Sequence, residues 1–151
     1  MSEPLPSSDL NLDREQRFSS AFQQLMGYRL VEWAPDYAVV AYDVMPDHLN
    51  RTNRLHGGVI ASLLDTAAGY AGCFCATPGE TRTTVTLSLT VNFLASASSG
   101  SLRISARRTG GGKTIFFSEA TALDAENRTV ATAVGTFRYV SATPVGSPQS
   151  Q

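Results

Sequence analysis

The chain has little excess charge and few cysteines, and these shortages exclude several classes of protein. Twelve Lys and Arg residues against 13 Asp and Glu residues give a formal net charge of -1 over 151 residues. No broad basic face is therefore available for a nucleic-acid backbone or an anionic membrane surface. The two cysteines, Cys73 and Cys75, lie two positions apart, a spacing that on a helix suits neither a disulfide nor a metal site. We expect both to be buried, reduced thiols.

A long uninterrupted apolar segment is also missing. The run from Gly57 to Ala76 approaches the ~20 apolar residues that span a bilayer, but Asp65 stands near its centre and many of its residues are Ala or Gly. The first residues, MSEPLPSSDLNLDREQ, lack the basic and apolar regions of a signal peptide and the Arg-rich, acid-poor character of a transit peptide. We therefore expect a cytoplasmic protein without a membrane partner.

The composition suits a single folded domain. Hydrophobic residues make up 42% and charged residues 17% of the chain, which is ordinary for a globular protein. Both ends are rich in Ser and Pro. We expect residues 1–12 to be a flexible segment, residues 13–140 to form the domain and residues 141–151 to be a flexible tail.

The first half of the chain alternates helical and extended patterns. Residues 14–27 place Phe18, Phe22, Leu25 and Met26 at helical spacing before Gly27, which predicts one amphipathic helix. YRLVEW and YAVVAYDVM flank APD and predict a hairpin. Residues 57–76 lack period-two alternation and are too many for a strand, so we expect a buried helix that is apolar nearly all round.

The second half of the chain is predicted to be strands. Residues 84–93 alternate, with Val85, Leu87, Leu89, Val91 and Phe93 on one face and polar residues on the other. SLRISARR, KTIFFSEATAL and RTVATAVGTFRYV follow, separated by the turn sequences TGGG and DAEN, and predict hairpins in series. The expected fold is an α+β domain in which an antiparallel sheet of about six strands packs on the long helix.

Three features resemble the hotdog-fold acyl-CoA thioesterases, and within them the phenylacetic-acid-pathway branch. They are HGGVIASLLD at residues 56–65, the amide Asn50 six positions before the His, and TVNFLASA at residues 90–97. Members of the family carry Gln and Glu or Asn and Asp at two key positions, and Asn50 with Asp65 resembles the second group. The resemblance covers roughly Phe18 to Val140 and implies a sheet wrapped around the helix. It also implies a homo-oligomer, either a dimer whose two sheets are continuous or a dimer of dimers.

Chemical reasoning gives Asp65 and Gly57 the central roles. Hydrolysis of a thioester builds negative charge on the carbonyl oxygen, which the free N–H groups at a helix N-terminus stabilise; Gly57 is placed for this. Asp65 then acts as nucleophile or general base. Asp65 lies eight residues after Gly57, which corresponds to about 12 Å along the helix. Asp65 and Gly57 can therefore contact the same thioester carbonyl only if Asp65 belongs to a second subunit. The structural alternative for Asp65 is an exposed acid or an ion pair with arginine.

The neighbouring residues have supporting roles in this interpretation. Gly58, like Gly57, has no Cβ and lets a bulky acyl carbonyl approach the backbone. His56 orients the loop, with acid catalysis as the alternative. The resemblance implies that Asn50 and Thr86 position the attacking water, although Asn is also a common turn residue and Thr a common strand residue. His48 has no matching role and is expected at the surface.

The turn RRTGGGKT does not meet the P-loop pattern, because Arg107 stands where glycine is required and a strand follows. The resemblance places this turn near the pantetheine or nucleotide of CoA. Arg107, Arg108, Lys113 and Thr114 are therefore candidates for phosphate contacts, with a solvated hairpin tip as the alternative.

The resemblance thus implies a thioesterase that hydrolyses an aromatic or medium-chain acyl-CoA to the free acid and CoA. No metal or other cofactor is expected, since CoA is part of the substrate. Tyr70, Phe74 and Phe93 either line the acyl pocket or belong to the core. Two alternatives stay open: a hydratase or dehydratase of the same fold, in which His56 is catalytic, and a non-catalytic acyl-CoA-binding module.

Overall fold

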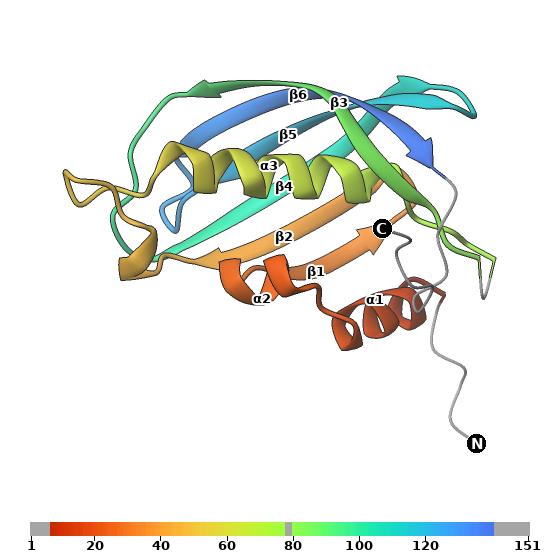
Figure 1. The fold of residues 1–151 in the computed structure, drawn as a ribbon, viewed down its shortest axis with the longest axis horizontal. Helices are drawn as coiled ribbons and strands as arrows, with labels where there is room; N and C mark the ends of the chain where they lie inside the picture. Colours follow the sequence, from red (N-terminus) through yellow and green to blue (C-terminus); the bar gives the residue numbers. More distant parts are fainter. Residues whose placement is uncertain (1–6, 78–79, 141–151) are drawn as a thin grey trace, which may run out of the picture.

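A single helix enclosed by a curved sheet forms the centre of the molecule (Figure 1). The computed structural model describes residues 7–77 and 80–140. The sheet is antiparallel with the strand order β1-β2-β4-β5-β6-β3, which confirms the expected α+β architecture. The strands are β1 (Arg29–Ala34), β2 (Tyr37–Asp43), β3 (Thr83–Phe93), β4 (Ser101–Gly111), β5 (Ile115–Leu123) and β6 (Thr129–Val140).

The strand pairing differs from a simple series of hairpins. The β1–β2, β4–β5 and β5–β6 pairs are hairpins as expected, but β3 pairs with β6, and β4 pairs with β2. Residues 94–100, which connect β3 to β4, are longer than a tight hairpin loop and carry the chain across the sheet. As a result, β1 and β3 are the two edges of the sheet.

A β-bulge in β3 reverses the faces of that strand. The register moves from Thr86 opposite Phe137 to Ser88 opposite Thr136, so one extra residue is inserted at Leu87. Leu89 and Val91 pack on the core after the bulge, whereas Leu87 is 53% exposed. The prediction that all five apolar residues of this strand share one face is therefore wrong, and the polar Thr86 faces the helix instead.

The central helix is α3, Gly57–Ala71, which ends earlier than the expected residue 76. Its small residues Ala67, Ala68 and Ala71 are buried against the sheet. The helix stops at Gly72, where an added Cβ would lie 2.2 Å from the ring of Phe116. Among the described residues, no helix combines the length and the apolarity that a membrane crossing needs.

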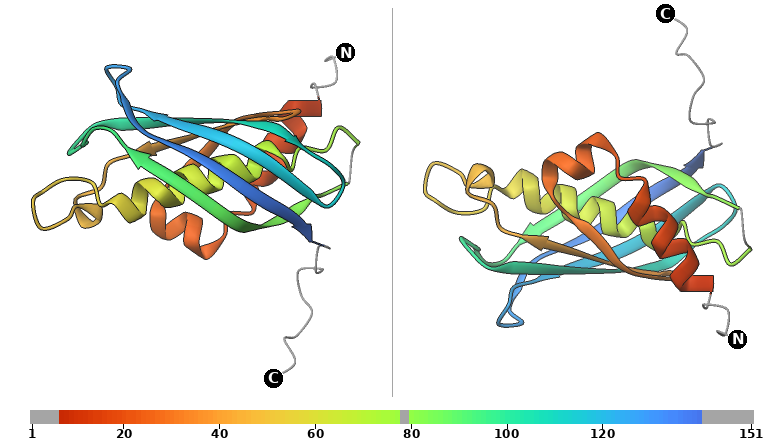
Figure 2. Two further views of the ribbon diagram at one scale, coloured as in Figure 1. Left: turned by 90° about the horizontal axis from the view of Figure 1, so that it is seen from above. Right: turned by 90° about the horizontal axis from the view of Figure 1, so that it is seen from below.

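The N-terminal region contains two helices where one was expected. Helix α1 is Ser7–Arg17 and helix α2 is Ala21–Met26, because the Ser20 side chain accepts a hydrogen bond from Gln23 N at 3.1 Å and starts a new helix. Gly27 ends α2 with φ 75°, as predicted. Both helices lie on the side of the molecule opposite β3 and β6 (Figure 2).

Residues 7–12 of the expected flexible segment lie in helix α1. Asn11 is buried in α1 and its Nδ2 donates to the carbonyl oxygen of Cys75 at 2.5 Å. The Ser- and Pro-rich composition of this region did not indicate helix α1, because a short helix is stabilised mainly by tertiary contacts rather than by its own sequence. Residues 1–6 and the expected tail 141–151 lie outside the described residues.

Candidate active site

Asp65 and Thr86 form a hydrogen-bonded pair halfway along the central helix. Thr86 Oγ1 donates to Asp65 Oδ1 at 2.7 Å, which is possible because the bulge in β3 turns Thr86 toward α3. Both residues line a cleft of about 600 Å³ between α3, β3 and α1. Asp65 is half-buried and has no ion-pair partner among the residues described. One carboxylate is thus presented to an open cleft and oriented by a hydroxyl.

The N-terminus of α3 presents a free backbone donor. His56 is the N-cap, and its Nδ1 accepts a hydrogen bond from Gly58 N at 2.9 Å. The carbonyl of His56 accepts from Val59 N and Ile60 N. Within the described part of the chain, the Gly57 N–H has no hydrogen-bond partner. The Nδ1 of His56 thus fixes the start of the helix, whereas its Nε2 takes no part in this contact.

The Asn50 side chain closes the loop that precedes this helix. Its Oδ1 accepts from Thr52 N at 2.9 Å, from Thr52 Oγ1 at 2.8 Å and from Arg54 N at 3.2 Å. The side-chain oxygen of Asn50 thus stabilises the turn, as expected for a turn residue. Among the described residues its Nδ2 has no partner, so a donor is left for a ligand.

His48 anchors the same loop, and the expectation of a surface residue is wrong. Its ring is half-buried and stacks on that of Tyr42, and the Tyr42 hydroxyl lies 2.6 Å from Nδ1. The His48 carbonyl also accepts a hydrogen bond from His56 N at 3.0 Å. No periodic pattern links the two residues, because Tyr42 lies in β2 and His48 ends the short 3-10 helix Pro46–His48. Together they tie the loop that carries Asn50 to the buried face of the sheet.

The predicted site residues fall into two groups within one chain. Asn50, His56, Gly57 and Gly58 gather at the N-terminus of α3, whereas Asp65 and Thr86 lie further along the helix. The eight residues between Gly57 and Asp65 correspond to about 12 Å of helix. A single carbonyl group cannot contact both groups in one subunit.

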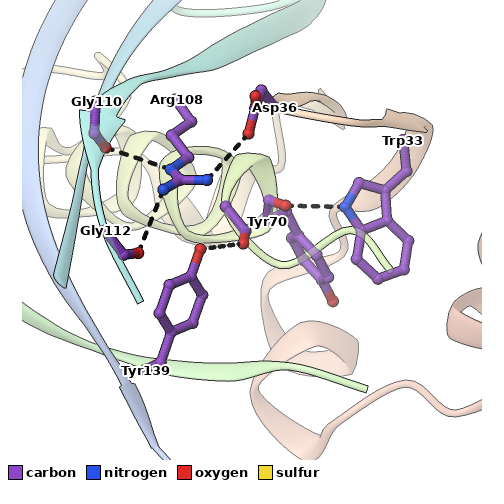
Figure 3. A network of polar contacts seen from close by, with 8 residues as sticks. Trp33, Asp36, Tyr70, Arg108, Gly110, Gly112 and Tyr139 are labelled. Atoms are coloured by element: carbon purple, nitrogen blue, oxygen red, sulfur yellow. Dashed lines mark hydrogen bonds and ion pairs between the residues drawn. The ribbon is translucent and has the colours of Figure 1, made fainter. Parts of the chain in front are cut away.

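Several residues around Tyr70 at the far end of the cleft were not singled out from the sequence. Tyr70 OH donates to Glu15 Oε1 at 2.6 Å, and Trp33 Nε1 donates to the Tyr70 carbonyl at 2.8 Å, as Figure 3 shows for the second bond. Burial, followed by the nearby Glu15 carboxylate, raises the pKa of Tyr70, so its hydroxyl stays neutral. Arg14 and Arg82 complete this end. These residues come from α1, β1, α3 and the segment before β3, and no sequence spacing links them.

The aromatic residues considered for the acyl pocket have three different environments. Tyr70 lines the cleft. Phe74 packs edge-to-face on Trp33 and is partly buried against the core. Phe93 is exposed, and its ring lies 3.3 Å from the position that a Cβ on Gly57 would take. Of these three aromatic residues, Tyr70 is therefore the one that lines the cleft containing Asp65.

The four candidates for phosphate contacts are divided by the structure. Arg108 and Lys113 line a second cleft of about 480 Å³, together with Arg82 and Tyr139. Arg108 also donates to the Gly110 and Gly112 carbonyls and lies 3.5 Å from Asp36 (Figure 3). Arg107 instead lies over the ring of Tyr37, 4.9 Å from its centre. Arg107 and Thr114 are not among the lining residues of this cleft.

Both cysteines are free and buried, as expected from their spacing. Burial raises the pKa of Cys73 to about 12, with a smaller contribution from the neighbouring Cys75. Cys73 lines the cleft but is a protonated thiol at neutral pH. It is therefore not a nucleophile for this site.

Comparison with known proteins agrees with this geometry. The family described as the thioesterase superfamily matches residues 52–131, a range that includes Gly57, Asp65 and Thr86. No protein with a curated function matches the chain. A conserved protein from Pseudomonas aeruginosa is 28% identical, with a TM-score of 0.74 over 83% of this chain and 98% of that one.

Two further solved structures share the fold. The E. coli PaaI protein from the phenylacetic acid degradation operon is 23% identical, with a TM-score of 0.77 over 93% of this chain and 99% of that one. A Streptococcus mutans protein bound to acetyl CoA is 24% identical, with a TM-score of 0.65 over 75% of this chain and 88% of that one. With a family match over more than half of its length, the chain belongs to the thioesterase superfamily and has the hotdog fold.

Proposed function

We propose that this protein is an acyl-CoA thioesterase in which Asp65 is the catalytic carboxylate. The observation that carries this proposal is the hydrogen bond of 2.7 Å from Thr86 to Asp65 Oδ1 at the edge of an open cleft. A carboxylate within a largely apolar helix lowers the stability of the fold unless it has a hydrogen-bond partner, and such a residue is a candidate for a functional site. The acetyl CoA found with the Streptococcus mutans neighbour supports a CoA thioester as the ligand.

In this mechanism, Asp65 either attacks the thioester carbonyl carbon or removes a proton from a water molecule that does so. The Gly57 N–H, which has no other partner in the described residues, donates to the carbonyl oxygen as negative charge develops there. Asn50 Nδ2 and Thr86 Oγ1 hold the attacking water or the carboxylate in place. Collapse of the tetrahedral intermediate releases CoA as the thiol. When water is the attacking group this leaves the free acid; when Asp65 attacks directly it leaves a mixed anhydride on Asp65, which a water molecule then hydrolyses to the free acid.

The two groups of residues serve one reaction only when two subunits combine. Edge strand β3 is 11 residues long and one of its sides has no neighbouring strand in the sheet. We infer that it pairs with β3 of a second copy, so that Asp65 of one subunit approaches Gly57 of the other. A two-fold dimer then holds two equivalent sites.

The acyl group is proposed to be aromatic or of medium length. Trp33, Tyr70 and Phe137 line the cleft next to Asp65 and supply apolar walls. The alternative hydratase chemistry needs His56 as an acid or base. Capping engages only its Nδ1, so the product distinguishes the two reactions: a hydratase leaves a changed acyl chain attached to CoA.

The test is incubation of purified protein with a panel of acyl-CoAs and a thiol-detecting reagent. We expect release of free CoA by the wild type, and a loss of about 10²–10⁴-fold in kcat for Asp65→Asn with an unchanged melting temperature. Asp47→Asn, an exposed acid in the loop before α3, is the matched control and should keep full activity. A changed acyl chain still attached to CoA, or tight binding without turnover by the wild type, would refute the proposal.

A further inference from the structure

The cleft beside Asp65 has opposite charges at its two ends. Strand β3 runs antiparallel to the end of α3, with Thr86 bonded to Asp65 and Thr84 next to Gly69, where an added Cβ would lie 3.4 Å from Thr84 Cγ2. Arg82 stands two residues before Thr84, just ahead of the first residue of β3, and lines the cleft together with Cys73. A ligand that begins at Asp65 and follows the helix therefore ends at Arg82.

The walls between these ends are mostly apolar. Trp33 and Tyr70 meet edge-to-face with ring centres 5.4 Å apart, and Phe137 lines the same cleft. Gly69 has no side chain and leaves room beside the helix. Such walls accept methylene groups or a ring, but they offer no partner for a charge until the far end.

The far end has more positive than negative charge. Arg82 is stacked over the ring of Tyr139 at 5.6 Å and has no carboxylate within ion-pair distance in the described part of the chain. Arg14 is a second guanidinium at this end, and it is half-buried. Among the described residues that line this end of the cleft, the acid is Glu15, and it already accepts a hydrogen bond from the Tyr70 hydroxyl. The Arg82 side chain is exposed, and its cation–π contact with Tyr139 favours one arrangement of the guanidinium, which reduces the entropy lost when an anion binds.

We propose that this cleft selects acyl groups that carry a second carboxylate at the end remote from the thioester, with Arg82 as the specificity-determining residue. The inference rests on the proposed thioesterase function. A guanidinium binds a carboxylate through two parallel hydrogen bonds, and a carboxylate left unpaired between apolar walls is strongly disfavoured.

The length of the cleft sets the length of the acyl group. Helix α3 rises about 9 Å from Asp65 to its end at Ala71, and Cys73 lies two residues further, so the cleft is about 12 Å long. With a contact of about 3 Å subtracted at each end, an acyl chain of about six carbons fits. The probe is hexanedioyl-CoA, and hexanoyl-CoA is its match in length without the terminal charge.

The experiment compares kcat/KM for these two thioesters. We expect the wild type to favour hexanedioyl-CoA by about 10-fold or more, and Arg82→Gln to bring the ratio of the two values to about one. Arg138→Gln is the matched control, because Arg138 is exposed on β6 next to the cleft-lining Phe137 and points the other way. It should keep the wild-type ratio.

Three outcomes overturn the inference: a wild-type ratio of one or below, a preference that survives Arg82→Gln, or an equal loss in Arg138→Gln. Each leaves the thioesterase proposal standing as long as hexanoyl-CoA or another thioester is hydrolysed through Asp65. Failure of every thioester would instead refute the proposed function itself. Thermal melting of both arginine variants identifies a loss caused by unfolding, and Arg82→Lys, which keeps the charge, should retain part of the preference.

Discussion

Thr86 is the residue that fixes the direction of the Asp65 carboxylate, and its hydroxyl can be removed with little change in shape. In Thr86→Val, Asp65 Oδ1 loses the donor that lies 2.7 Å away. We expect kcat to fall by about 10-fold, less than for Asp65→Asn, since the base remains but is no longer oriented. Thr90→Val, on the outward face of the same strand, is the control for the added methyl group. Steady-state kinetics that give equal values for both variants would remove Thr86 from the mechanism.

Cys73 provides a second test at the residue scale. Its pKa is raised to about 12, so at pH 8 the thiol is protonated and unreactive. We expect a disulfide reagent to modify neither cysteine in the native protein, since both are buried, and to modify both in guanidinium chloride. Rapid labelling under native conditions, followed by absorbance, would contradict the burial of these side chains.

At the scale of elements, the loop of residues 46–56 depends on the contact between Tyr42 and His48. Tyr42→Phe removes the hydroxyl 2.6 Å from His48 Nδ1 and leaves a half-buried ring nitrogen without that partner, at a cost of about 0.5–1.5 kcal/mol. We expect kcat to fall more than KM changes, because Asn50 and His56 lose their fixed positions. Hydrogen exchange of the loop amides should become faster.

A conservative replacement separates this positioning role from a general loss of packing. His48→Asn keeps a polar atom near Nδ1 and should retain more activity than His48→Ala. Equal kinetic losses with no change in loop exchange would mean that the contact serves stability alone.

The end of α3 gives a prediction about stability. Gly72→Ala places a methyl group 2.2 Å from Phe116, which is fully buried and cannot move away freely. Overpacking of this kind costs about 1–3 kcal/mol, so the melting temperature should drop by several degrees. Gly112→Ala, where nothing lies within 4 Å of the added atom, should melt like the wild type. A stable Gly72→Ala variant would show that the β5 side of the core adapts easily.

The elements illustrate which parts of the structure are encoded locally. Alternation and turn residues predicted the strands, and the apolar run predicted α3, because these signals lie within a few positions of one another. Other features depend on residues far away in the sequence. The end of α3 at Gly72 depends on Phe116, which lies 44 residues later, and the bulge at Leu87 depends on the pairing of Thr86 with Phe137, which lies 51 residues later. The connection of residues 94–100 across the sheet is likewise set by distant strands. Contacts over such distances leave no periodic pattern. For the same reason the sequence indicated Asp65 but not the distant Arg82 or the Tyr42–His48 pair.

At the scale of the whole molecule, sharing of the site between subunits can be tested by complementation. Asp65→Asn and Asn50→Ala damage different halves of each site, so a mixed dimer holds one site with both defects and one intact site. Random mixing makes half of the dimers mixed, and total activity should recover to about one quarter of the wild-type value. We expect this recovery after co-expression, with each variant alone nearly inactive.

Light scattering provides the necessary companion measurement, with at least a dimer expected for the wild type and for both variants. Activity in the mixture that equals the average of the separate variants would place the complete site within one subunit. A monomeric wild type that hydrolyses thioesters would have the same meaning.

The inserted Leu87 makes the chemistry of this chain sensitive to the length of one strand rather than only to its composition. Shortening β3 by that residue would restore even alternation, and either Thr86 would turn toward solvent or Leu89 and Val91 would leave the core. Consider a related chain that keeps Asp65 and Thr86 but lacks Leu87. It has the same catalytic residue types, but the threonine hydroxyl no longer points toward the carboxylate. Loss of a single codon at this point would therefore separate folding from catalysis while leaving every proposed catalytic side chain in the gene.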